Sequence, residues 1–401
     1  MKIAVFHNLP SGGAKRALYE FLKELKKRGH TIDAFLPQTA NEQFLPLDDA
    51  VNKKQIYPVK TFLPCINLKG FRTLYFLEQS LIAQAKCQRL IAKDINNGGY
   101  DLVFANHSVP TQSPFLLRYL KIPSVYYIQE PIRWAYEHPV KDIDTVIKRS
   151  TSRMLYERAL VKYLLKPLDE SNIAYSTILL VNSYYSHESI MKAYGLNSYV
   201  SYLGVNTEIF KHNHNTPREN IILSVGRLIQ QKGFRFIIKA MAKVANKINK
   251  PKLIIIGDDN SYSEHNVLTS LARENNIDIE IKIGITDTEL VKYYNKALLV
   301  VYAPYLEPFG LVTLESMACG TPVIGVKEGG VREIIENGIT GLLVERDVNE
   351  FAWAIEYLLH NKDKRDKMGN NAIESVKGKW TWQKAADNLI SHFESALKQP
   401  G

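Results

Sequence analysis

The sequence predicts two domains of the α/β class, each built around a parallel sheet. Short segments rich in Val, Ile and Leu alternate with amphipathic segments of helical period along most of the chain, which is typical of parallel sheets covered by helices. The chain has 401 residues, of which 45% are apolar, and this is enough for two packed cores of ordinary size. We therefore expect two domains with a cleft between them.

The first half of the chain opens with an apolar strand over residues 2–6. A loop leads from it into a helix from about residue 17 to residue 28, and a second strand follows at residues 31–37. Gly29 is expected to cap that helix, because glycine adopts the left-handed conformation of a C-terminal cap without strain. Later strands of this half are expected to end near Asn106, Gln129 and Ser183. Parallel strands place their ligand loops at such carboxyl ends.

The second half repeats the alternation. Strands are expected at residues 220–226, 252–257, 279–284, 298–303, 322–326 and 341–345. We place the domain boundary near Gly204, which gives a first domain of residues 1–203 and a second of residues 204–379. Residues 380–401 are amphipathic at helical spacing and form a final helix.

Charge is distributed unevenly along the chain, whose formal net charge is +10. Residues 1–205 contain 26 Lys and Arg against 17 Asp and Glu, whereas the remaining residues contain 25 against 24. The basic excess favours an anionic ligand or membrane surface for the first half, with a solvated lysine-rich surface as the alternative. Nucleic acid is not the expected partner, since aromatic residues do not alternate with basic ones in any strand.

The chain is expected to be cytosolic and reduced. It has no signal-peptide core after its first strand and no apolar stretch near the ~18 residues that a membrane span needs. Its three cysteines are Cys65, Cys87 and Cys319, and they form neither an even set nor a C-x-x-C pair. We expect buried thiols and neither disulfides nor a structural zinc site.

A motif between residues 301 and 330 carries the clearest chemistry. Glu307 lies in a loop before an expected helix, and Glu315 lies inside that helix. Each carboxylate can accept both hydrogens of a vicinal diol, and a sugar nucleotide carries one diol on the hexose and usually one on the ribose. The first N–H groups of the helix, at Phe309, Gly310 and Leu311, are suited to the diphosphate between them. The motif therefore predicts a nucleotide-sugar site.

A second motif covers residues 224–234 and supplies cations. A strand ends at Gly226, and Arg227 and Lys232 flank the loop that enters the next helix. Two cations there can face a diphosphate and stabilise the negative charge that builds on it as a glycosidic bond breaks. A surface Arg and Lys at a helix start is the alternative, which the helix dipole disfavours.

Together these motifs resemble the group 1 family of retaining glycosyltransferases. Its signature is a pair of Glu residues separated by seven positions, with Phe-Gly after the first and Gly-Thr-Pro-Val after the helix, and all of these pieces are present. The resemblance implies two facing Rossmann-like domains of GT-B architecture, with the C-terminal helix crossing back to the first domain. It also implies that Glu307 holds hydroxyls of the donor sugar and that Glu315 holds the ribose. The loop containing Gly329 would border the diphosphate.

Residues of the first domain are added to the site by the same resemblance. Relatives carry a Gly-Gly pair in the first loop, which corresponds to Gly12 and Gly13, although a plain tight turn is the alternative. Many relatives have a histidine that reaches the donor sugar where Gln129 stands here. Glutamine can still hydrogen-bond a hydroxyl but cannot take a proton, so we expect His107 to contact substrate, with a capping or packing role as the alternative.

Two further clusters are weaker. Glu130, Arg133 and Trp134 could contact an acceptor, but a buried ion pair with an aromatic cover would give the same pattern. Asp142 and Asp144 match the metal-binding D-x-D string, but they lie in a segment that is expected to be helical. The Asp258–Asp259 pair follows a strand and would shape the nucleotide site.

The sequence thus predicts a retaining, metal-independent hexosyltransferase that needs no cofactor. Its donor is expected to be a UDP- or GDP-sugar and its acceptor a carbohydrate or a lipid-linked sugar, in polysaccharide or glycolipid synthesis. By resemblance, the leaving phosphate takes the acceptor proton and no protein nucleophile is required. The alternatives are a non-catalytic subunit that binds the donor, and a sugar-nucleotide epimerase or phosphorylase of related architecture.

Overall fold

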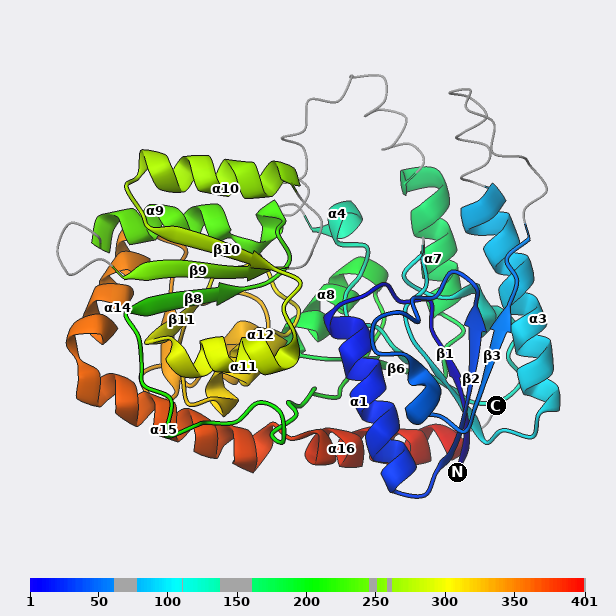
Figure 1. Ribbon diagram of the computed structural model, residues 1–401. Coiled ribbons are helices and arrows are strands. Elements are labelled where there is room, and N and C mark those ends of the chain that lie inside the picture. The colour runs from blue at the N-terminus through cyan, green and yellow to red at the C-terminus, as the bar shows by residue number, and fades with distance from the viewer. Residues whose placement is uncertain (61–77, 110, 138–160, 245–250, 258–261, 400–401) are drawn as a thin grey trace. The chain divides into compact units, whose positions relative to one another are not determined.

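The computed structural model describes residues 1–60, 78–109, 111–137, 161–244, 251–257 and 262–399 (Figure 1). As far as these residues show, the chain forms two compact units. The first unit contains residues 1–137, 161–202 and 385–399, and the second contains residues 203–384. The division after residue 202 lies one residue from the expected boundary, whereas the second unit extends to residue 384 rather than 379.

The first unit is built on a seven-stranded parallel sheet with the order β3-β2-β1-β4-β5-β6-β7. Its strands are β1 (Lys2–Phe6), β2 (Thr31–Pro37), β3 (Lys53–Tyr57), β4 (Leu102–Ala105), β5 (Ser124–Tyr127), β6 (Ile178–Val181) and β7 (Tyr199–Val200). Its α-helices are α1 (Gly13–Lys27), α3 (Gln84–Asn97), α4 (Arg133–Tyr136), α7 (Lys166–Ile173) and α8 (Tyr184–Tyr194). Single turns of 3₁₀ or π type are η1 (Leu47–Asp49), η2 (Glu78–Ala83), η3 (Phe115–Tyr119) and η4 (Val161–Leu165).

The first helix begins earlier than expected. It starts at Gly13 rather than near residue 17, because Gly12 takes a φ of +131° and turns the chain directly into the helix. Gly29, after its end, has a φ of +81°, in agreement with the expected cap. The early start places Gly13, Ala14 and Lys15 in the first turn of α1.

Register aligns the carboxyl ends of the central strands of this sheet. Phe6 of β1 pairs with Ala105 of β4, and Ala105 pairs with Tyr126 of β5. The residues that follow these strands, including His107 and Gln129, therefore emerge along one edge of the sheet.

The second unit is built on a six-stranded parallel sheet with the order β10-β9-β8-β11-β12-β13. Its strands are β8 (Ile221–Val225), β9 (Lys252–Gly257), β10 (Ile279–Ile283), β11 (Leu299–Tyr302), β12 (Val323–Val326) and β13 (Gly341–Val344). Its helices are η5 (Gln230–Lys232), α9 (Phe234–Val244), α10 (Tyr262–Glu274), α11 (Asp287–Lys296), α12 (Leu311–Ala318), α13 (Val331–Ile334), α14 (Val348–His360) and α15 (Lys362–Lys379). Figure 1 shows α9 and α10 on one side of this sheet and α11 and α12 on the other.

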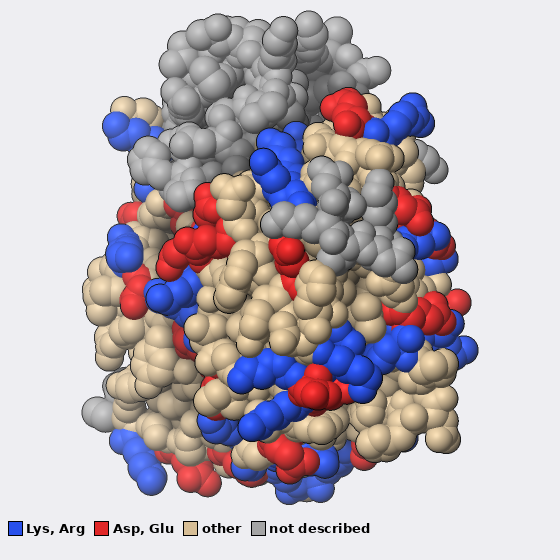
Figure 2. Space-filling view, turned by 90° about the vertical axis from the view of Figure 1, so that its left-hand side faces the viewer, with Lys and Arg blue, Asp and Glu red and all other residues tan. Residues whose placement is uncertain are grey.

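Strands β8, β11 and β12 of the second unit are central and buried, whereas the edge strand β10 has no fully buried residue. All the residues of β8, β11 and β12 are buried, in keeping with the Val- and Ile-rich runs that predicted them. On the face in Figure 2, Lys and Arg side chains are interspersed with Asp and Glu. This mixture agrees with the nearly balanced charge of the second half of the chain.

The last helix, α16 (Trp382–Leu397), begins in the second unit and packs on the first, as the fold class implied. It is drawn in red in Figure 1. Phe393 is fully buried, and its ring lies 5.3 Å from that of Phe104 in β4. Asp387 accepts a hydrogen bond of 2.8 Å from Arg28 at the end of α1. The first unit is therefore completed by the end of the chain.

Two further expectations concern thiols and membrane spans. Cys87 and Cys319 are buried and free, as expected, and Cys65 lies outside the described residues. Among the helices that the structure describes, none is both long and apolar enough to cross a bilayer.

Candidate functional site

The loop between β11 and α12 carries Glu307 and joins the two motifs of the second half. Lys232 donates a hydrogen bond of 2.7 Å from Nζ to Oε2 of Glu307. The two side chains are only 18% and 16% exposed, so the pair is partly shielded from water. The acid of one motif is thus held against a cation of the other, which the sequence could not establish.

Close backbone contacts fix this loop and explain several glycines. A Cβ atom on Gly233 would lie 1.9 Å from the carbonyl oxygen of Ala303, and one on Gly329 would lie 2.3 Å from that of Glu307. The Gly330 N–H donates a hydrogen bond of 2.8 Å to the same Glu307 oxygen. Only glycine allows such an approach, so Gly329 has a packing role at the backbone of Glu307. Leu306, just before the acid, has a φ of +49°, which is strained for a side chain of this kind.

Glu315 lies on α12, one turn from its beginning, and is 7% exposed. Its Oε2 accepts a hydrogen bond of 2.9 Å from the hydroxyl of Tyr294 on α11. Burial, together with the charge of Glu315, raises the pKa of Tyr294 well above its ordinary value, so the phenol remains a donor. Arg218 in turn donates to the Tyr294 carbonyl oxygen at 2.9 Å. The Glu315 carboxylate is therefore held by a hydrogen bond from Tyr294, whose backbone is itself held by Arg218.

The beginning of α12 presents backbone N–H groups between the two acids. Gly310 is the N-cap with a φ of +111°, and Leu311 is the first helical residue. The first N–H groups of a helix have no partner within the helix. Phe309 is different, because its side chain is 3% exposed and its ring lies 6.0 Å from that of Trp380. The Phe309 side chain thus anchors the loop, and its backbone is the part suited to a ligand.

Arg227 is exposed and follows Gly226 at the carboxyl end of β8. Its carbonyl oxygen accepts a hydrogen bond of 2.7 Å from the Ile229 N–H, which closes a tight turn before η5. Lys232 is the last residue of η5. Of the two expected cations, Lys232 is therefore the one that the structure records against Glu307.

Arg346 is a supporting residue that the sequence reasoning missed. It makes a two-pronged ion pair with Glu328, with both hydrogen bonds 2.7 Å long, and donates to the carbonyl oxygens of Ala303 and Pro304 at 3.0 and 2.7 Å. Its guanidinium lies 3.9 Å from the centre of the Tyr305 ring. Arg346 follows β13, so a basic residue at a strand end was the available signal. It fixes the chain that leads to Glu307.

The first-unit candidates lie along the carboxyl edge of its sheet. Gly12 caps α1 and Gly13 begins it. The His107 carbonyl oxygen accepts a hydrogen bond of 2.9 Å from the Asn8 N–H, and burial lowers the pKa of the His107 ring to about 4. The ring is therefore neutral at pH 7. Gln129 is partly buried, and its carbonyl oxygen accepts a hydrogen bond of 3.1 Å from Ser186.

The proposed acceptor cluster near Glu130 contains an ion pair. Arg133 donates a hydrogen bond of 2.7 Å to Glu137 and lies 3.7 Å from Glu130. These contacts agree with the structural alternative for this cluster. The side chain of Trp134 lies outside the described part of the molecule.

Metal ligands were expected to be absent from the site. The D-x-D string at Asp142 and Asp144 and the Asp258–Asp259 pair lie outside the described residues. Within the residues that the structure does describe, no three His, Cys, Asp or Glu side chains gather in a way that could hold a metal ion.

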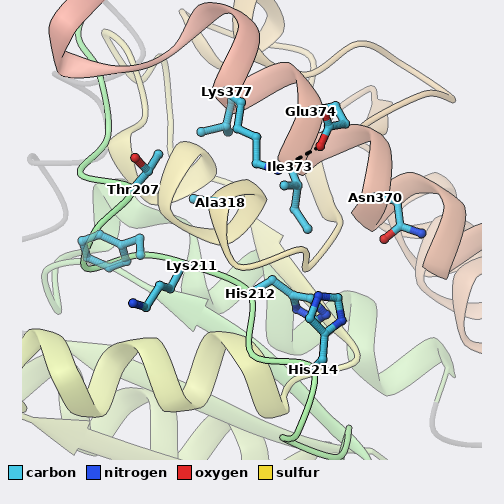
Figure 3. Close-up of a pocket in the computed structure, with 11 residues that line it drawn as sticks. Thr207, Lys211, His212, His214, Ala318, Asn370, Ile373, Glu374 and Lys377 are labelled. Carbon is cyan, nitrogen blue, oxygen red and sulfur yellow. Dashed lines mark hydrogen bonds and ion pairs between the residues drawn. The ribbon is translucent and has the colours of Figure 1, made fainter.

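A pocket of about 390 Å³ lies at the other end of α12 (Figure 3). It is lined by Thr207, Phe210, Lys211, His212, His214, Ala318, Asn370, Ile373, Glu374, Val376 and Lys377. His212 donates a hydrogen bond of 3.1 Å from Nδ1 to the carbonyl oxygen of Cys319, just after the helix. The acids and the helix beginning belong to the opposite end of α12, so this pocket is separate from the candidate site.

Comparison with known proteins gives the family. A model described as Glycosyltransferase Family 4 matches residues 11–209, and one described as Glycosyl transferases group 1 matches residues 205–375. The chain belongs to the group 1 family of glycosyltransferases, as the two motifs predicted.

Individual relatives match this chain at about one third identity or less, and some over only part of its length. An uncharacterized glycosyltransferase of Methanocaldococcus jannaschii is 34% identical over 186 residues, which are 46% of this chain and 47% of the relative, so the match spans about half of that protein. A D-inositol 3-phosphate glycosyltransferase of Corynebacterium glutamicum is 27% identical over 74% of this chain and 73% of its own length. The solved structure of Alr3699/HepE from Anabaena, in complex with UDP and glucose, has a TM-score of 0.71 and 18% identity, covering 98% of this chain and 100% of that one. This likeness shows that the fold is the GT-B fold.

Proposed function

We propose that the chain is a retaining glycosyltransferase that moves a hexose-type sugar from a nucleotide-diphosphate sugar to an acceptor hydroxyl. The observation that carries this proposal is the arrangement around the beginning of α12, where Glu307 and Glu315 lie on either side of Gly310 and Leu311 while Lys232 is paired with Glu307. Each acid can accept hydrogen bonds from the two hydroxyls of a diol, and the helix N–H groups can donate hydrogen bonds to a phosphate.

The chemistry follows from where charge develops. The bond between the anomeric carbon and the phosphate oxygen breaks, and the electron pair stays on the diphosphate, where Arg227 and Lys232 stabilise it. The acceptor oxygen bonds to the anomeric carbon on the same face, and its proton passes to the leaving phosphate. With a pKa of about 4, the His107 ring is a poor proton carrier at neutral pH, so its role is a hydrogen bond to a hydroxyl.

The remaining roles also belong to this proposal. Gly12, Gly13, Gln129 and Gly329 are proposed as further donor contacts or their supports. The acceptor is a carbohydrate or a lipid-linked sugar, and the basic first half attracts an anionic acceptor or an anionic membrane at the cytosolic face. The Corynebacterium relative is named a D-inositol 3-phosphate glycosyltransferase, and a phosphorylated acceptor would agree with such a preference.

A thermal-shift panel of UDP-, GDP- and ADP-glucose tests donor binding. We expect one of these to raise the Tm of the full chain, because a ligand at 100 times its Kd stabilises by about 2.7 kcal/mol. EDTA is expected to leave that shift unchanged, since Arg227, Lys232 and the helix N–H groups meet the donor charge. If the panel is extended to other sugars on the same three nucleotides and no compound raises the Tm, the proposal is contradicted.

Slow donor hydrolysis without acceptor tests the stereochemistry. From an α-linked donor, we expect the first free sugar seen by NMR to be the α anomer. A β anomer as first product would contradict retention.

The same assay separates the second candidate function, a donor-binding subunit without activity. That candidate is favoured by one observation, the Gln129 that stands where many relatives have a histidine. It predicts a clear thermal shift with no hydrolysis and no transfer.

Replacing Tyr294 by phenylalanine is expected to raise the KM for the donor. The change removes the hydrogen bond to Glu315, and a hydrogen bond to a charged group is worth about 1.5 kcal/mol or more, so KM should rise roughly tenfold. Tyr293→Phe is the matched control, because the neighbouring ring packs against Lys282 instead. Equal KM values for the two variants would show that the hydrogen bond from Tyr294 does not help Glu315 to bind the donor.

A further inference from the structure

A buried ion pair lies directly behind the glycine loop of the first unit. Lys15, in the first turn of α1, is fully buried and donates from Nζ to a carboxylate oxygen of Glu42. Its Nζ also lies 3.0 Å from Nε2 of His7, the residue after β1, and Glu42 lies 3.3 Å from the same nitrogen. We call these three residues the Lys15 cluster. They come from three segments, which are the end of β1, the first turn of α1 just after Gly12 and Gly13, and the loop after β2.

This arrangement is a costly way to fill a core. A cation in the first turn of a helix opposes the helix dipole, and removing charged groups from water costs several kcal/mol. Burial lowers the pKa of Lys15, and it lowers that of His7 to about 4. Burial raises the pKa of Glu42, but hydrogen bonds from His7 and Lys15 outweigh this and hold it below its ordinary value. Apolar side chains would pack here at lower cost, so stability alone does not explain the cluster.

The cluster is connected to the backbone of the loop between β1 and α1. The Leu9 N–H donates a hydrogen bond of 3.2 Å to Nδ1 of His7, which assigns the proton of the neutral ring to Nε2, facing Glu42. The Leu9 carbonyl oxygen accepts a hydrogen bond of 3.1 Å from the N–H of Asn41, next to Glu42. Movement of the cluster therefore moves the loop.

Asn8, which lies between His7 and Leu9, extends these connections to a second candidate residue. The Asn8 N–H donates to the His107 carbonyl oxygen at 2.9 Å, and the Asn8 side chain accepts a hydrogen bond of 3.0 Å from Thr39. The segment next to Glu42 is thus connected to the loop that leads to Gly12 and, through Asn8, to the backbone of His107.

We propose that the Lys15–Glu42 pair is a positioning device that holds the Gly12–Gly13 loop in the conformation that binds donor phosphate. The inference rests on the proposed function for the donor contact of that loop. In this role Lys15 never touches the donor. Its charge favours one arrangement of the loop, because any other would leave a buried cation without its carboxylate. Glu42 is 16% exposed and also accepts hydrogen bonds of 3.1 Å from Lys54 and from the Leu47 N–H, so its own position is set from a second side.

The test compares ion pairs at opposite ends of the same helix. Lys15→Met breaks the Lys15 cluster, whereas Arg28→Met breaks the two pairs of 2.8 Å that the partly exposed Arg28 makes with Glu24 and Asp387 at the far end of α1. For each variant we would measure the Tm, the kcat and KM for the nucleotide sugar that responds in the thermal-shift panel, and amide hydrogen exchange of residues 8–13. Both variants are expected to lower the Tm.

Only Lys15→Met is expected to raise the donor KM, by about tenfold or more, as loss of hydrogen bonds to a charged group does, and to speed exchange in the loop. Adding Glu42→Gln to Lys15→Met should raise KM by less than the product of the two single effects, because both changes break the Lys15–Glu42 pair, although Glu42→Gln also removes the pair of 3.1 Å with Lys54. Equal KM values for Lys15→Met and Arg28→Met would overturn the proposal, even if loop exchange increased.

Glu42→Gln alone covers the case in which Lys15→Met does not fold. It keeps the size of the side chain and removes its charge, and it should raise KM in the same direction. An unchanged KM in this variant would also overturn the proposal. If the wild-type chain binds no nucleotide sugar, the proposed function fails instead, and the exchange rates still report whether the pair orders the loop.

Discussion

Replacing Lys232 by alanine is expected to lower kcat by roughly 100- to 1000-fold, the usual effect of removing one preorganised donor to developing charge. The Lys232 side chain is 18% exposed and its ammonium lies 2.7 Å from Glu307, so its position is set before the donor binds and its charge is only partly screened. Steady-state kinetics with the donor found by thermal shift would measure the effect.

The control for this variant is Lys239→Ala, which removes an exposed lysine from α9 in the same unit. Its kcat is expected to remain within about twofold of the wild-type value, because an exposed surface charge contributes little. A decrease in kcat of less than fivefold for Lys232→Ala would show that this lysine does not stabilise the leaving diphosphate.

Replacing Gly233 by alanine is expected to destabilise the second unit and to weaken donor binding. Gly233 has a φ of +73°, and its new Cβ would lie 1.9 Å from the Ala303 carbonyl oxygen, so the backbone before Glu307 must move. The left-handed conformation alone costs about 1–2 kcal/mol for a residue with a Cβ, and the displacement adds to this. Thermal denaturation and donor titration would measure both effects.

Gly338→Ala is the matched control for backbone strain. Gly338 has a φ of +77°, but a Cβ there meets nothing within 4 Å. The difference in Tm between the two variants therefore isolates the contact with Ala303. Identical Tm values and donor affinities would mean that the loop can relax without affecting Glu307.

Much of the fold could be predicted because the buried strands are continuous apolar runs. Strands β8 and β11 have every residue buried, so their sequences are almost entirely apolar, with Ser224 the one serine among them. Strand β3 was missed because it lies at the sheet edge and has the sequence KKQIY, in which only the final tyrosine is buried. A polar edge strand looks like a loop in sequence, since its pairing partner is remote.

The candidate site was predictable where its residues share a motif. The spacing of Glu307 and Glu315 around a helix beginning is local, and the structure keeps it. The contact of Arg346 with Ala303 and Pro304 was not predictable, because it depends on the order of strands in the sheet. Lys15 was passed over for a similar reason. A lysine in an amphipathic helix is normally solvated, and its burial depends on a carboxylate from a distant segment.

The path of α16 limits how this protein can be divided. Residues 385–399 belong to the first unit, although every residue from 203 to 384 belongs to the second. A fragment that stopped at residue 202 would lack Phe393 and leave the Phe104 ring without its partner. Dissection into separately expressed halves should therefore fail for the N-terminal piece. A circular permutant that joins residue 385 onward to the original N-terminus through a short linker would be the appropriate starting point.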